Sequence, residues 1–229
     1  MELTPNEGKK CIIEVDGARY ERLPIKTHLI TDKDDIVEVA QQYGTPVLSQ
    51  PGDVLFITEK IVACTQGRAI PLKDIHPRKL AYWLSDKVTK TPHGIGLGMP
   101  ETMEMALQEV GAPRILFAAA VSVIGKKIFK KKGWFYNVAG YKARSIDGPC
   151  HNTIPPYNQC VVLGPLEPDK VACQIKEKIG YDVLIADIND LEGQILGASS
   201  KEEALKLVQP GDFAVYAGEF TELANGLVA

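Results

Sequence analysis

"YDVLIADINDLEGQILG", residues 181–197, combines a short apolar run with a cluster of acidic and amide side chains. Its centre, Val183 to Ala186, has the length and composition of a fully buried β-strand. Asp187, Asn189 and Asp190 follow directly. Carboxylates at the exit of a buried strand either cap the next helix or hold a cation, and these residues leave both alternatives open. The stretch predicts a sheet with a polar edge, where Asp187 and Asp190 are candidate metal ligands.

Outward from this strand, helices and strands follow one another without regular alternation. Residues 11–23 are typical of a β-hairpin that turns at Asp16-Gly17, because this pair tolerates the backbone of a tight turn. A turn at 50–53 introduces a strand that ends near Ile57, and the same four turn residues recur at 209–212. Capping residues and apolar spacing predict helices over 34–44 (capped by Gly44), 76–88, 100–111, 167–180 and 200–208. Residues 114–128 are apolar enough for a buried helix or a strand, and their length and alanines favour a helix.

This mixture favours an α+β fold with mixed or antiparallel sheets, flanking helices and two closely joined lobes. No stretch has the composition of a linker. We therefore expect residues 1–229 to form a single domain. An arrangement of two intertwined lobes within that domain is the alternative.

Composition and net charge argue against several classes of protein. The net charge of −3 argues against a nucleic-acid partner, since no general positive field is present. The five cysteines show no Cys-x-x-Cys spacing, which argues against a disulfide framework or a structural zinc site. The longest apolar run, from Ile115, has about half the roughly 20 residues that cross a bilayer. We expect a soluble, cytoplasmic protein with no membrane partner.

Two further stretches are rich in polar groups, but only the first has the features of a binding site. The loop at 145–159 holds Asp147, His151 and Asn152 ahead of two prolines. It suits a binding site, although Asp147 followed by Gly148 is equally typical of a side-chain-capped turn. Asp34 and Asp35, in contrast, are expected to cap the helix that follows them.

Three blocks, taken in order, resemble the gamma-glutamyl ligase family that extends the precursor of coenzyme F-420. The first is "LITDKDDIVEVA" with "GDVLFITEKIVACTQGR", and the second is "AGYKARSIDG" with the His-Asn pair at 151–152. The third is "VVLGPLEPDKVACQIKEKIGYDVLIADIND". The resemblance implies a homodimeric enzyme that uses GTP or ATP and magnesium or manganese. It implies that L-glutamate is joined to the terminal carboxylate of a cofactor of deazaflavin or folate type.

The resemblance also implies roles for individual residues. Asp147 and Asp187 would hold the metal, with Asp190 as a nearby substitute. Nucleotide contacts would come from Asn152, from the segment Thr27, His28, Leu29 and Ile30, and from the region of Lys60 and Arg68.

Two positions depart from the family pattern. In the third block Ile188 stands where the family has a threonine after its aspartate. Where the family has a lysine before the closing Gly-Arg, this chain has Cys64. Lys60 stands four residues earlier; if the stretch were a strand, Lys60 would lie on the same face but about 13 Å away. The departure at Cys64 supports an alternative function, a non-catalytic protein that keeps the ligase fold and binds a nucleotide or another anion.

Overall fold

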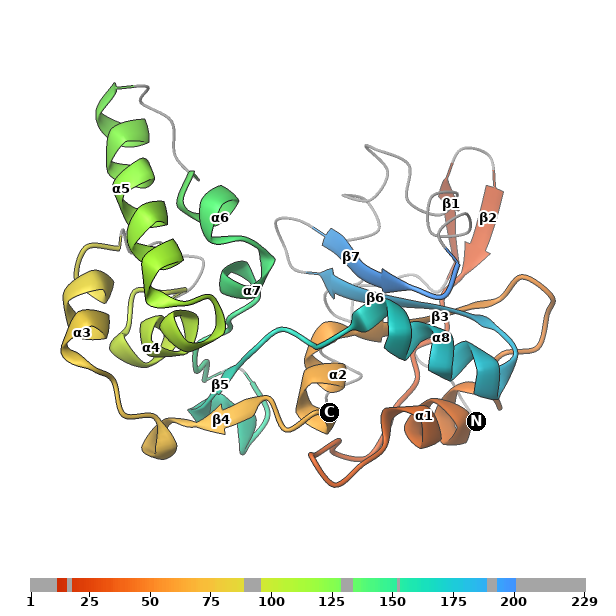
Figure 1. The fold of residues 1–229 in the computed structure, drawn as a ribbon. Helices are drawn as coiled ribbons and strands as arrows, with labels where there is room; N and C mark the ends of the chain where they lie inside the picture. The colour runs from red at the N-terminus through yellow and green to blue at the C-terminus, as the bar shows by residue number, and fades with distance from the viewer. Residues whose placement is uncertain are drawn as a thin grey trace. The chain divides into compact units, whose positions relative to one another are not determined.

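The computed structural model describes residues 12–15, 18–88, 96–128, 134–151, 153–188 and 193–200. Contacts divide the chain into two compact units, of which unit 1 comprises residues 1–67 and 165–229 and unit 2 comprises Arg68–Gly164. Helices accompany a mixed three-stranded sheet and two small antiparallel sheets (Figure 1). The predicted α+β class is confirmed.

Unit 1 is built on a mixed sheet with the strand order β3-β6-β7. β3 (Val54–Thr58) pairs in parallel with β6 (Asp182–Ile188), which pairs antiparallel with β7 (Gly193–Ala198). Val183, Leu184 and Ile185 of β6 are at most 1% exposed. The predicted buried strand is therefore confirmed, and it is the central strand of the sheet.

Helix α8 (Pro168–Ile179) packs against this sheet, and α1 (Ile36–Val39) packs against α8. α8 contacts β6 and β7, and it begins with a proline and ends at Gly180, which has φ +80°. α1 is followed by the π-helical turn η1 (Ala40–Gly44). Apolar side chains of α1, α8, β3 and β6 form the core of the unit.

The N-terminal cap of α1 agrees in part with the prediction from the sequence. Asp35 is the N-cap, and its Oδ1 accepts hydrogen bonds from the amides of Val37 and Glu38 at 2.7 and 3.2 Å. Asp34 was also expected to cap this helix, which is wrong, because its carboxylate is bound by Thr31 and His28 instead. One aspartate suffices to cap the helix, so the other is available for a different contact.

The expected C-terminal cap at Gly44 is also wrong. Gly44 lies inside the π-helical turn and has no positive φ. A Cβ atom at this position would lie 3.2 Å from Cδ2 of Leu55. The missing side chain therefore serves close packing against β3 rather than a left-handed cap.

The N-terminal hairpin belongs to unit 1 as well. β1 (Ile12–Val15) and β2 (Ala18–Glu21) pair antiparallel, with Val15 opposite Ala18. This confirms the predicted hairpin, although Asp16 and Gly17 themselves lie outside the described residues. The helix predicted over 200–208 and the turn at 209–212 also lie outside them, apart from Ser200.

Unit 2 has a short two-stranded sheet, β4 (Ala69–Pro71) paired antiparallel with β5 (Cys160–Val162). Between these strands, the described residues form five helices: α3 (Lys79–Ser85), α4 (Pro100–Glu109), α5 (Ala112–Ile128), α6 (Trp134–Ala139) and α7 (Tyr141–Arg144). Two 3₁₀ turns complete it, Leu72–Asp74 and Tyr157–Gln159. Its own core includes Leu97, Met103 and Ile115, each at most 1% exposed.

The boundaries of α4 follow local signals, since Pro100 is its first residue and Gly111, with φ +92°, follows its end. α5 confirms the predicted helix but buries only one face, and Phe117 is 63% exposed. In the described part of the chain, no single helix is long and apolar enough to cross a membrane. Only Pro100–Glu109 together with Ala112–Gly125 meets that length and composition, as a pair bent by 117°.

Candidate functional site

The predicted site residues are divided between the two units. Unit 1 holds Asp187, Lys60 and the segment Thr27–Ile30, and unit 2 holds Arg68 and Asp147. Asn152 and Asp190 lie outside the described residues. The two units are considered one at a time, beginning with unit 1.

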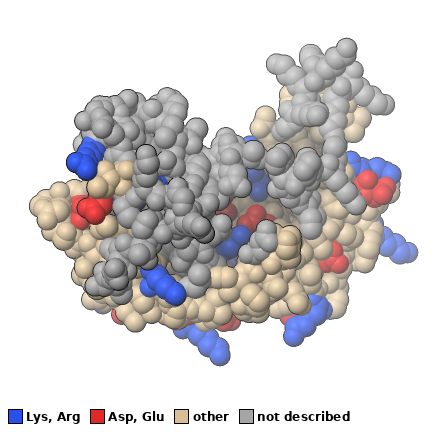
Figure 2. Space-filling model, turned by 180° about the vertical axis from the view of Figure 1, so that it is seen from behind, with Lys and Arg blue, Asp and Glu red and all other residues tan. Residues whose placement is uncertain are grey.

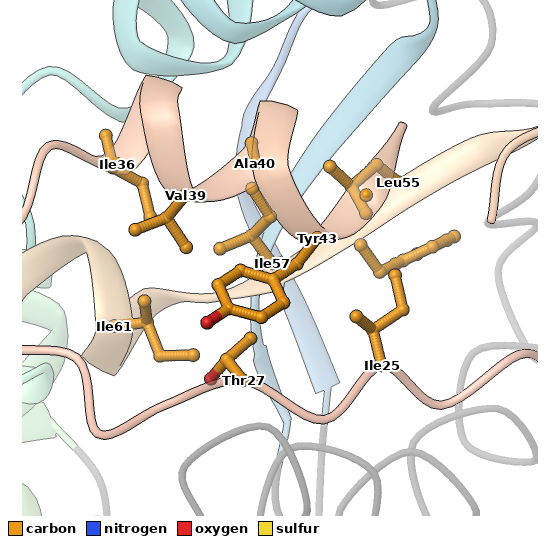
Figure 3. A pocket seen from close by; sticks show the side chains of 11 residues that line it. Ile25, Thr27, Ile36, Val39, Ala40, Tyr43, Leu55, Ile57 and Ile61 are labelled. Atoms are coloured by element: carbon orange, nitrogen blue, oxygen red, sulfur yellow. The ribbon is translucent and has the colours of Figure 1, made fainter. Parts of the chain in front are cut away.

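A small apolar pocket in unit 1 lies between the loop that follows the hairpin, the α1–η1 segment and β3 (Figure 3). Its cavity volume is about 40 Å³, against roughly 300–1,000 Å³ for pockets that enclose drug-sized ligands. The Tyr43 ring extends across it, with the hydroxyl oxygen directed to the side where Thr27 and Ile61 lie. The pocket can accept the edge of a ring or an alkyl group, and Thr27 and Tyr43 supply its hydroxyl groups.

His28 connects this pocket to the start of α1. Its Nδ1 lies 2.8 Å from the Tyr43 hydroxyl, and its Nε2 lies 2.9 Å from Oδ1 of Asp34. The other oxygen of Asp34 accepts hydrogen bonds from the amide and the hydroxyl of Thr31, at 2.7 and 2.9 Å. We call these four residues, Tyr43, His28, Asp34 and Thr31, the His28 network.

The charge state of Asp34 follows from these contacts. The hydrogen bond from His28, and then that from the Thr31 amide, hold the pKa of Asp34 below its ordinary value. The carboxylate is therefore ionised at neutral pH and can only accept hydrogen bonds. It follows that Nε2 of His28 carries a proton.

The rest of the segment has mixed exposure. Ile30 is a core residue at 5% exposure, whereas Leu29 is 37% exposed. The Thr27 hydroxyl donates to the His28 carbonyl at 2.8 Å. The segment is thus anchored at Ile30, while Thr27 lines the pocket.

Asp187 lies near the carboxyl end of β6, with a half-buried side chain. It is paired in the sheet with Gln194 of β7. Helix capping by Asp187 is therefore wrong, because the residue belongs to a strand whose next described element is another strand. The alternative that it holds a cation stays a prediction.

Lys60 and Cys64 belong to a helix, α2 (Glu59–Thr65), so the strand spacing considered for these two residues does not apply. Thr58 caps this helix directly after β3, accepting a hydrogen bond from the Lys60 amide at 3.3 Å. Four helical residues advance only about 6 Å and return to the same face. Lys60 is therefore much nearer to position 64 than a strand would place it. Cys64 itself is 4% exposed.

Arg68 and Asp147 both stabilise the chain ends of unit 2. The Arg68 guanidinium donates to the Gly164 carbonyl at 2.6 Å and to Glu109 at 2.7 Å. Asp147 pairs through its backbone with Val162, which lies opposite Ala69 on its other side. The Asp147 backbone thus extends the small sheet, and its half-buried carboxylate remains a predicted metal ligand.

Metal binding can be tested against the donors that are present. Among the described residues, no group of three or more His, Cys, Asp or Glu side chains gathers to hold an ion. Magnesium, however, commonly takes one or two protein carboxylates and completes its shell with phosphate oxygens and water. The side chains of Asp187 in unit 1 and Asp147 in unit 2 each carry a carboxylate of this hard, anionic type, so each by its chemistry fits a divalent metal.

Charge on the surface is mixed. On the face drawn in Figure 2, the described basic and acidic side chains are scattered or grouped with one another. They form no extended patch of one sign among the described residues on that face. The described residues on this face therefore produce no extended field of one sign.

Sequence reasoning missed Tyr43 and the role of Asp34. Tyr43 follows His28 by 15 residues, and the π-helical turn that brings them together leaves no recognised pattern in the sequence. The contact between His28 and Asp34 could have been predicted from the sequence. Only one of the two aspartates before the helix is needed as its cap, and His28 lies six residues before the other.

Comparison with known proteins completes the description of the site. No protein with curated annotation matches this chain. The family model described as F420-0:gamma-glutamyl ligase matches residues 24–196, a range that includes the Thr27–Ile30 segment, Asp147 and Asp187. This match covers more than half of the chain, and the protein therefore belongs to the F420-0:gamma-glutamyl ligase family.

Proposed function

We propose that the protein joins L-glutamate to the terminal carboxylate of a cofactor of deazaflavin or folate type, using GTP or ATP and magnesium or manganese. The family match over residues 24–196 carries this proposal. The half-buried carboxylate of Asp187 at the end of β6 supports it. We further propose that the protein acts in the cytoplasm as a homodimer, without a nucleic-acid or membrane partner.

The reaction has two steps. An oxygen of the acceptor carboxylate attacks the terminal phosphorus of the nucleotide, the nucleoside diphosphate leaves, and an acyl phosphate is formed. The amine of glutamate then attacks the carbonyl carbon, phosphate leaves with the electrons of the broken C–O bond, and the nitrogen loses a proton. A divalent metal, when bound, neutralises charge on the phosphate oxygens.

Residues of this chain supply the binding groups. Asp187 and Asp147 would provide carboxylates to the metal. Lys60 would face the phosphates from α2, since the buried thiol of Cys64 cannot supply the positive charge of the family lysine. The Thr27–Ile30 segment would lie along the nucleotide, with Thr27 at the small apolar pocket.

Cys64 also favours a second function from another class. A protein that has exchanged a phosphate-binding lysine for a buried cysteine could retain nucleotide or anion binding and lose catalysis. The two functions differ in one observable, since only the ligase forms nucleoside diphosphate in the presence of an acceptor and glutamate.

Thermal unfolding with GTP, ATP or GDP, each with and without magnesium or manganese, tests the proposal. A nucleotide at 100 times its Kd stabilises by about 2.7 kcal/mol, and we expect Asp187→Asn to lose the metal-dependent part. Asp32→Asn, an exposed aspartate of the same unit, is the matched control. Assays with deazaflavin and folate acceptors follow. Binding without glutamate transfer supports the second function. No binding by any nucleotide contradicts the ligase and leaves only the second function, with an anion other than a nucleotide as its ligand.

A further inference from the structure

The His28 network links three separate parts of unit 1. His28 lies in the loop before α1, Asp34 directly precedes that helix, and Tyr43 lies in the π-helical turn after it. The contacts are 2.8 Å at Nδ1 and 2.9 Å at Nε2, so both imidazole nitrogens are used. The rings of His28 and Tyr43 are 5.6 Å apart and tilted by 43°. The imidazole is held from two sides in one orientation.

The direction of the hydrogen bonds follows from the ionised Asp34. Nε2 of His28 donates to the carboxylate, and in the neutral ring Nδ1 must then accept a hydrogen bond from the Tyr43 hydroxyl. Tyr43 is thereby fixed at the pocket, with its hydroxyl group held by His28. Thr27, next to His28 in the chain, lines the same pocket.

These contacts contribute little to stability. The side chains of His28 and Asp34 are 42% and 24% exposed, and exposed polar pairs generally stabilise a fold only slightly. Asp35 caps α1 without help from the network, and Ile30 anchors the segment in the core. The network therefore orients groups around the pocket and adds little to the stability of the unit.

We propose that His28 is a positioning residue that raises nucleotide affinity by holding the Thr27–Ile30 segment and Tyr43 in their binding geometry. This inference rests on the proposed function, because it needs the nucleotide to lie along that segment. Asp34 orients the imidazole, and Tyr43 receives the effect at the pocket. The network acts on binding, not on the transfer of the phosphoryl group.

The test compares wild-type protein with His28→Ala, His28→Gln, Tyr43→Phe and the exposed control Asp32→Asn. Calorimetry measures the Kd of GTP and ATP in the presence of magnesium, and thermal unfolding without nucleotide measures stability. Loss of one or two oriented hydrogen bonds should weaken binding about fivefold to tenfold in His28→Ala. Glutamine can keep the donor to Asp34, so His28→Gln should recover part of the affinity. Where turnover is measurable, KM for the nucleotide should rise while kcat changes little.

The outcomes separate the inference from the proposed function. A wild-type protein that binds nucleotide, with a His28→Ala variant that binds it equally well, overturns the inference alone. If His28→Ala lowers both the melting temperature and the nucleotide affinity, and His28→Gln restores neither, the role of His28 is merely structural. That outcome also overturns the inference. A wild-type protein that binds neither nucleotide overturns the proposed function and this inference together.

Discussion

The carboxylate of Glu104, on α4, receives the backbone amide and the guanidinium of Arg78 at the start of α3. The amide donates at 3.0 Å and Nη2 at 2.7 Å, and Gln108 donates to the same carboxylate at 3.0 Å. The Glu104 side chain is 2% exposed, whereas that of Arg78 is 50% exposed. One buried carboxylate thus joins the two helices and satisfies an amide at the N-terminus of α3.

Replacing Glu104 should destabilise the protein substantially. Glu104→Ala leaves a cavity and removes the acceptors of the Arg78 amide, for an expected loss of about 2–4 kcal/mol. Urea unfolding at neutral pH measures the loss. Glu167→Ala, at an exposed surface ion pair with Lys170, should change stability by less than about 1 kcal/mol. Equal losses in the two variants would contradict a special role for the buried carboxylate.

The same residue predicts a dependence of stability on pH. Burial raises the pKa of Glu104, but the hydrogen bonds from Arg78 and Gln108 outweigh it and hold the pKa below its ordinary value. A depressed folded-state pKa stabilises the fold above the unfolded pKa, about 4.3, and the stabilisation is lost as the pH falls through the folded pKa. The stability gap between wild type and Glu104→Gln should therefore narrow from pH 7 to pH 3. A gap that stays constant in urea titrations at both pH values would contradict this assignment.

Gly197 should tolerate no side chain. A Cβ atom there would lie 2.3 Å from the Pro168 carbonyl carbon, at the start of α8. Backbone cannot move aside as a flexible side chain can, so Gly197→Ala should cost at least about 2 kcal/mol. Gly180→Ala is the comparison, since nothing lies within 4 Å and only its φ of +80° is unfavourable, which costs about 1–2 kcal/mol. Thermal unfolding of both variants should place Gly197→Ala lower.

Variants at Lys60 and Cys64 test which position supplies the positive charge for the phosphates of the nucleotide. Lys60→Ala should raise the Kd of a nucleotide about tenfold or more, because a charged hydrogen bond to phosphate is lost. Cys64→Lys should not restore the family function, since it forces an ammonium into a position that is 4% exposed, at a cost of several kcal/mol. Calorimetry and thermal unfolding measure the two effects. Lys178→Ala, at an exposed lysine of α8, controls for loss of charge. An unchanged Kd in Lys60→Ala would exclude the lysine from the site.

Local signals in the sequence predicted much of the fold. Pro100, Gly111, Pro168 and Gly180 mark helix ends through their own backbone preferences, which act regardless of tertiary context. The buried run before Asp187 predicted the central strand for the same reason. These elements were predictable because each depends on a few neighbouring residues.

The remaining features depend on tertiary contacts. α2 was not predicted as a helix, because its residues are apolar and partly β-branched, and only the cap at Thr58 distinguishes it as a helix. Gly44 was misassigned because packing against Leu55, not the local backbone, explains the glycine. The contact between His28 and Tyr43 depends on a π-helical turn, which no spacing in the chain predicts.

The position of unit 2 within the chain sets an order of folding. β3 pairs with β6, and Val54 and its partner Asp182 are 128 residues apart (182 − 54), so this pairing must wait until most of the chain has been synthesised. The ends of unit 2 meet within the unit itself, where Arg68 Nε lies 2.6 Å from the Gly164 oxygen. A folded unit 2 therefore shortens the loop that β3 and β6 must close and lowers its entropic cost. We expect the inserted unit to fold first during synthesis, and the central sheet of unit 1 to form only after α8 and β6 emerge.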